Sequence, residues 1–169
     1  MKKQLILFVL VVACLSGLSC SNNGAKDSFE SAKKKYDLKD YQGAIADYTK
    51  AIEQKQNYAE AYYKRGVAKW ALKDYQGTIA DVTKAIELKP DYVDAYFNRG
   101  IAKGSLGDLQ GAVADFTMAI ELKPNYVEAY YNRGISYLGL NQKSNAMTDL
   151  MKAMELGQRV PQEFLDACK

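Results

Sequence analysis

Apolar and small residues recur along most of this chain at spacings of three and four, which is the pattern of amphipathic helices. Over residues 59–88 the pattern predicts two helices, from about Ala59 to Leu72 and from about Tyr75 to Leu88, joined by a short turn. The same pair recurs with a period of 34 residues. Residues 27–160 therefore form one domain of tandem helical hairpins, whose copies span residues 25–58, 59–92, 93–126 and 127–160.

Residue sizes recur in a fixed order. An aromatic residue early in the first helix precedes a glycine by four positions, and two small residues stand seven apart in the second helix. Pro90 and Pro124 close the middle copies, whereas Gln56 and Gln158 stand at that place in the outer copies. This order resembles the tetratricopeptide repeat family. The residues that carry the resemblance are Tyr62, Tyr96 and Tyr130; Gly66, Gly100 and Gly134; Ala44, Thr78, Ala112 and Ala146; and Ala51, Ala85, Ala119 and Ala153.

The resemblance implies an all-α solenoid of about four helix-turn-helix hairpins, with a short capping segment over residues 161–169. Asp40, Asp74 and Asp108 precede the second helices as N-caps, and Gln142 predicts a less sharp start for the last one. A glycine inside a helix costs about 1 kcal/mol relative to alanine, so the recurrent glycines predict a close approach of the two helices. In the cap, Phe164 and Leu165 are expected to cover Met147, Met151 and Met154.

Opposite charges also recur with the period. An array of this kind suits either a catalytic site or a structural ladder of ion pairs between helices. We favour the ladder, because identical environments repeated along a solenoid create no single focused site. Arg99 is expected to pair with Asp81 or Asp115, at the roughly 0–1 kcal/mol of partly exposed pairs. The ladder residues are Arg65, Arg99, Arg133, Asp47, Asp81, Asp115 and Asp149.

The first helix of each hairpin has a second stripe of residues, spaced by four and three, that does not face its partner helix. By resemblance to the family, this stripe lines a concave groove that binds peptide or protein segments. The alternative is that the stripe is scaffold and packs neighbouring first helices together. The candidate groove residues are Tyr63, Val67, Trp70, Asp94, Phe97, Asn98, Ile101, Glu128, Tyr131, Asn132 and Ile135, with Gly104 and Ser105 opening room beside Trp70.

The family's best-known groove grips a C-terminal carboxylate with lysine, asparagine and arginine side chains. Asn98 matches one of these, but Phe29 or Tyr63 replaces the first lysine, and Asp94 or Glu128 reverses the charge of another. We therefore expect no carboxylate clamp. The acidic edge formed by Glu60, Asp94 and Glu128 instead suggests a ligand with apolar anchors and basic residues.

Residues 1–20 have the layout of a secretory signal, with Lys2 and Lys3 before an apolar run that ends at Leu18. The last residues before Cys20 resemble the box at which bacterial lipoproteins are cleaved and acylated. Cys20 is the expected lipidation site, with Cys14 and simple secretion or an uncleaved anchor as alternatives. Residues 21–26 would form a polar tether. The expected location is the bacterial cell envelope, as a periplasmic or outer-membrane-associated lipoprotein.

Composition narrows the function further. The chain has no histidine, and without Lys2 and Lys3 its 23 basic residues fall to 21 against 20 acidic ones. A near-neutral chain with no basic stripe is a poor candidate for nucleic-acid binding. Once Cys14 and Cys20 are lost or acylated, Cys168 has no partner for an internal disulfide.

These features predict a non-enzymatic adaptor that binds proteins, with no metal, cofactor or small-molecule substrate. The alternative is a structural subunit of an envelope assembly or secretion complex that uses its convex and end surfaces.

Overall fold

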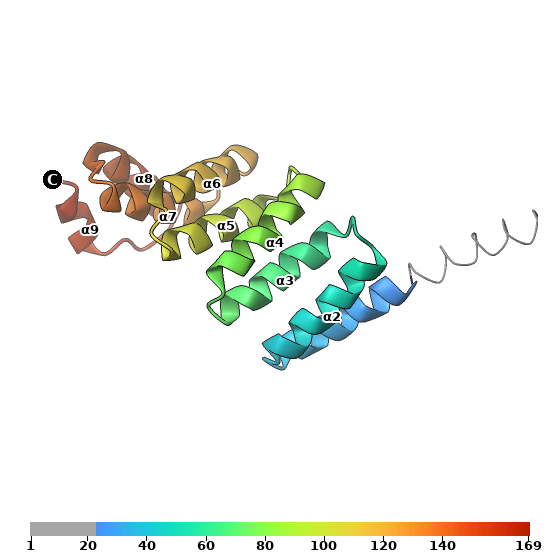
Figure 1. The fold of residues 1–169 in the computed structure, drawn as a ribbon. Coiled ribbons are helices and arrows are strands. Elements are labelled where there is room, and N and C mark those ends of the chain that lie inside the picture. The colour runs from blue at the N-terminus through green and yellow to red at the C-terminus, as the bar shows by residue number, and fades with distance from the viewer. Residues whose placement is uncertain (1–22) are drawn as a thin grey trace, which may run out of the picture.

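The computed structural model describes residues 23–169 and confirms the all-α class. Four helical hairpins stack side by side, and the ends of the described chain lie at opposite ends of the stack (Figure 1). The first hairpin contains helical residues 23–37 and α2 (Tyr41–Gln54). The others comprise α3 (Ala59–Ala71) with α4 (Tyr75–Leu88), α5 (Val93–Ser105) with α6 (Leu109–Leu122), and α7 (Val127–Gly139) with α8 (Lys143–Glu155). A short helix, α9 (Gln162–Ala167), follows.

The stack curves toward its first helices. The second helices inside the stack pack against both first helices beside them, as α4 does against α3 and α5. The first helices also contact one another, α3 with α5 and α5 with α7, while no comparable contact joins α4 to α6. The first helices therefore line the concave face, and the second helices form the convex face.

The turns confirm the expected caps. The side chains of Asp40, Asp74 and Asp108 each accept a hydrogen bond of 2.9 Å from the backbone N–H of the glycine three residues later. The side chain of Gln142 makes no such bond, although α8 still begins at the next residue. The turn itself requires one residue with a positive φ, and Gly107 adopts it at 84° without the steric cost that Lys73 bears at 64°.

The two helices of a hairpin approach closely at the recurrent glycine. A Cβ atom on Gly100 would lie 2.7 Å from Cε1 of Phe116, and one on Gly66 would lie 2.8 Å from Cγ2 of Val82. Neither distance leaves room for a methyl group. Glycine is therefore retained inside these helices despite its low helix propensity, because a buried side chain of the second helix occupies the space that a Cβ atom would need.

In each of the last three hairpins, an arginine on the first helix pairs with an aspartate on the second helix. Arg99 donates to Asp115 through Nε at 2.9 Å and Nη2 at 2.6 Å, and its Nη1 donates to Thr83 of the preceding repeat at 3.1 Å. Arg65 and Arg133 repeat this geometry with Asp81 and Asp149 and with Thr49 and Thr117. Arg99 is thus paired with Asp115, while Asp81 belongs to Arg65.

The first repeat replaces this arginine with Ser31. The Ser31 hydroxyl donates to Asp47 at 2.7 Å, and Lys35 lies 2.6 Å from the same carboxylate. These contacts hold the pKa of Asp47 well below its usual range, chiefly through the hydrogen bonds from Lys35, Lys50 and Ser31. Residues 23–26, which fall within the expected tether of residues 21–26, are helical, and Ala25 is buried.

The C-terminal cap follows its prediction in part. Phe164 of α9 turns toward Tyr131, with ring centroids 6.3 Å apart, whereas Leu165 lines an apolar pocket together with Met147, Met151 and Met154. Met151 remains 60% exposed and Met154 45% exposed. Six residues make α9 too short to cover the whole of α8, so this end of the stack keeps an apolar surface.

We expect Arg99→Ala to lower the free energy of unfolding by about 2 kcal/mol. The variant leaves the Asp115 side chain, which is 3% exposed, with only Lys103 at 2.8 Å as a cation, and it cuts the link to Thr83. Breaking a buried pair costs about 3–5 kcal/mol, and Lys103 offsets part of that. Urea unfolding measures the change, with Lys33→Ala in the exposed Lys33–Glu30 pair as the control. Equal effects of the two variants would refute the structural role of the ladder.

Candidate ligand groove

The candidate groove is the concave face lined by α3, α5 and α7. The structure divides the predicted residues into three sets. Tyr63, Phe97 and Tyr131 form aromatic contacts with neighbouring segments, whereas Trp70, Asp94 and Glu128 are exposed. The third set is half-buried and comprises Val67, Asn98, Ile101, Asn132 and Ile135.

Tyr63 and Phe97 belong to the junctions between repeats. The Tyr63 ring lies 4.6 Å from that of Tyr92, and the Phe97 ring lies 4.9 Å from that of Tyr126. Tyr63 is only 8% exposed. Tyr63, a candidate groove residue, therefore packs as the scaffold alternative describes, and truncation of Phe97 would remove packing as well as any ligand contact.

A lysine lies over the ring of each tyrosine that directly precedes α3, α5 or α7. The Nζ atoms of Lys55, Lys89 and Lys123 lie 4.6, 4.9 and 4.4 Å from the ring centroids of Tyr58, Tyr92 and Tyr126. Such cation–π contacts contribute about 0.5–1 kcal/mol at exposed sites. The sequence analysis did not predict these contacts, although the lysine precedes the tyrosine by three residues in all three cases.

Asn98 forms hydrogen bonds that connect the groove to the junction between repeats. Its Nδ2 donates to the Tyr63 hydroxyl at 2.7 Å and to the Asp94 carbonyl at 2.9 Å. Asn132 donates to the Glu128 carbonyl at 2.7 Å, one period further along the chain. The two amides therefore have fixed positions on the concave face.

Glu60, Asp94 and Glu128 follow the start of successive first helices and are exposed. The Tyr126 hydroxyl donates to Asp94 at 3.5 Å. Burial, followed by the nearby Asp94 and Glu128 charges, raises the pKa of Tyr126. The structure thus places three carboxylates along one edge of the groove.

A pocket of about 310 Å³ opens between α5 and α7 in the middle of this face. The buried Phe116 ring and Leu109 of α6 contribute apolar walls from behind. Sequence reasoning found Ile101, Asn132 and Ile135 but not Phe116 or Leu109, which reach the groove through the gap at the glycines. The lining comprises Gly100, Ile101, Gly104, Ser105, Leu109, Phe116, Asn132, Ile135 and Ser136.

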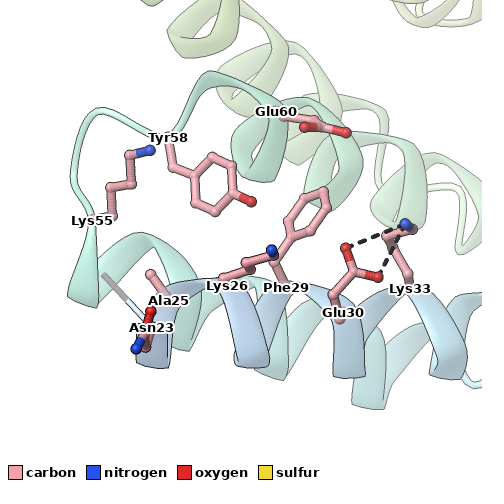
Figure 2. Close-up of a pocket in the computed structure, with 9 residues that line it drawn as sticks. All are labelled: Asn23, Ala25, Lys26, Phe29, Glu30, Lys33, Lys55, Tyr58 and Glu60. Atoms are coloured by element: carbon pink, nitrogen blue, oxygen red, sulfur yellow. Dashed lines mark hydrogen bonds and ion pairs between the residues drawn. The ribbon is translucent and has the colours of Figure 1, made fainter. Parts of the chain in front are cut away.

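A second pocket, of about 430 Å³, lies at the N-terminal end of the groove. Figure 2 shows the Phe29 and Tyr58 rings side by side above the first helix, with Glu60 beyond them. Lys33 pairs with Glu30 at 3.1 Å, and Lys26 and Lys55 lie on the other side. Because acidic and basic groups alternate around it, this pocket has no single charge preference.

Among residues 23–169 there is no group of three or more histidine, cysteine, aspartate or glutamate side chains able to hold a metal ion. None of the helices in that range is both long enough and apolar enough to cross a membrane.

Tyr63 is expected to make the fold sensitive to alkali. Burial raises the pKa of Tyr63 to about 12, from about 10 in an unfolded chain. Because the raised pKa belongs to the folded state, the stability it contributes is complete below pH 10 and is lost toward pH 12. Tyr63→Phe should cost about 1 kcal/mol at pH 7 through the lost bond from Asn98. It should also show a shallower loss of stability from pH 10 to 12 in urea titrations, and equal slopes would contradict this assignment.

Comparisons with known proteins agree with the stacked hairpins. A tetratricopeptide repeat model matches residues 32–73 and 104–141, and a second one matches residues 59–92 and 127–156. No significant match was found among curated proteins.

Three solved structures illustrate the likeness. MamA is 28% identical over 82% of this chain and 81% of its own, with a TM-score of 0.77. The first repeat domain of Spaghetti (RPAP3), bound to the HSP90 peptide SRMEEVD, is 28% identical over 71% of this chain and 95% of its own, with a TM-score of 0.70. The tetratricopeptide repeat domain of Arabidopsis OM64 is 28% identical over 69% of this chain and 96% of its own, with a TM-score of 0.67. With four hairpins of the expected period and two matching family models, the chain belongs to the tetratricopeptide repeat family.

Proposed function

We propose that this protein is a non-enzymatic adaptor that binds an extended peptide or protein segment in its concave groove. One observation carries the proposal. An open pocket with apolar walls lies on the same face as Trp70, which is 45% exposed although it is the largest apolar side chain in the protein. A soluble domain seldom exposes such residues together without a partner. The similar domain of Spaghetti (RPAP3) has a peptide bound, which supports the same use of the fold here.

The ligand is expected to differ from that peptide in charge. SRMEEVD is acidic, whereas Glu60, Asp94 and Glu128 line an edge of this groove and would repel it. A segment with apolar residues and nearby lysine or arginine complements the groove better.

The second part of the proposal concerns location. Cys20 lies outside the described residues, and its support is the leader sequence alone. Acylated at Cys20, the protein would be a lipoprotein of the bacterial envelope, with the first hairpin following the anchor after few residues. The groove would then be held near the membrane surface.

A second candidate function is a structural subunit of an envelope assembly. The exposed Met151 and Met154 on α8 favour it, since such side chains adapt to irregular protein surfaces. In that case the convex and end surfaces would carry the interaction and the groove would not.

Reversing the acidic edge tests which surface binds. A partner is first identified by crosslinking pull-down from the native envelope. We expect Asp94→Lys with Glu128→Lys to slow its association about tenfold or more at low salt and to weaken the salt dependence, because these rim charges steer the encounter. Glu121→Lys with Glu87→Lys on the convex helices makes the same change in net charge as a control. A slowdown in the control pair alone would favour the assembly subunit.

The anchor is tested by mass and fractionation. Acyl chains contribute about 0.8 kcal/mol per buried CH₂, so several chains hold a protein firmly on a membrane. Cys20→Ser should move the protein from the membrane fraction to the soluble fraction, whereas Cys14→Ser should leave it in place. An intact mass showing an unmodified Cys20 in the membrane-bound protein would overturn the assignment.

A further inference from the structure

Gly104 is a helix-interior glycine that packing does not require. A Cβ atom on Gly104 would lie 3.8 Å from the Cβ of Ala112, which is ordinary van der Waals contact. At Gly100, one turn earlier in α5, the nearest atom would lie at 2.7 Å. Glycine is among the least favourable residues inside a helix. The close approach of the helices explains why residue 100 is a glycine, but it does not explain why residue 104 is one.

The other repeats fill the same place with a large side chain. Tyr36, Trp70 and Leu138 stand one or more whole periods from Gly104. Only the third repeat leaves the place open, and the pocket of about 310 Å³ lies there. The missing side chain is therefore what makes the pocket.

The pocket suits one apolar side chain. Its back wall is the Phe116 ring, which is 2% exposed, and Ile101 and Ile135 flank the opening. Pockets for small molecules range from about 300 to 1,000 Å³ and enclose most of the ligand. This one is at the lower limit and open to solvent, so it fits a side chain of a longer ligand better than a separate molecule.

Polar groups at the rim indicate the nature of the ligand. Asn132 lines the pocket and is held by the Glu128 carbonyl one turn earlier in α7. Glu128 precedes Ile135 by seven residues, about 10 Å along a helix. About three residues of extended chain span that distance. A basic side chain within three residues of the bound apolar one can therefore reach the acidic edge.

We propose that the pocket at Gly104 is the specificity site of the groove and takes a large aliphatic or aromatic side chain of an extended peptide that carries lysine or arginine within three positions. The inference rests on the proposed peptide-binding function. The occupant follows from the apolar walls, the size of the opening and the charge of Asp94 and Glu128.

Filling the pocket tests the proposal. The probe is a displayed library of random dodecapeptides, selected on the immobilised full chain in detergent. Enriched peptides should share an apolar residue with a nearby lysine or arginine. Gly104→Leu, which copies Leu138, should weaken their binding at least tenfold without lowering the thermal midpoint. Met118→Leu on the convex face is the matched control and should bind as the wild type does.

The outcomes separate the pocket from the groove. If Gly104→Leu folds poorly, Gly104→Ala provides the smaller change and should still weaken binding severalfold. Selected peptides that lose affinity with Asp94→Lys but not with either Gly104 variant would overturn the pocket and leave the groove intact. Peptides indifferent to all these variants, or a library without enrichment, would overturn both.

Discussion

The contact of each first helix with the second helices on both sides is the constraint on which the structure depends. Arg99 shows how one side chain serves both contacts, because it binds Asp115 within its hairpin and Thr83 in the preceding one. A single hairpin cannot bury its apolar faces, so stability comes from such shared interfaces. The recurrent glycine is part of the same constraint, since the buried residue of the second helix needs its space.

This constraint decides what happens at the ends. The first repeat replaces the arginine with Ser31 and neutralises Asp47 with lysines of its own hairpin. At the other end, Met151 occupies the place of the bridging threonine, and Ala167 occupies that of the next arginine. Both partners of the bond are thus absent from the last junction. With Met151 and Ala167 at these places, the arginine–threonine hydrogen bond that links the earlier repeats cannot form at α8. The short α9 covers only part of the exposed surface of α8.

The groove consists of those side chains of the first helices that do not pack against a neighbouring repeat. Tyr63 and Phe97 look equivalent to Trp70 in a helical pattern, yet the tyrosines that precede α5 and α7 pack against them. The surface left for a ligand consists of Trp70, the pocket at Gly104 and the acidic edge. Its identity as an adaptor surface therefore rests on fewer residues than a helical stripe indicates.

The sequence alone determined the hairpins, the caps at Asp40, Asp74 and Asp108, and the need for close approach at Gly100, because these depend on local periodicity and on one neighbouring helix. It left open whether Arg99 pairs with Asp81 or Asp115, since both lie one helix away in the chain. Only the tertiary structure decided that pairing, the burial of Tyr63 and the exposure of Met151. Periodicity shows which residues share a face of a helix, but the packing of neighbouring repeats decides how much of that face stays open.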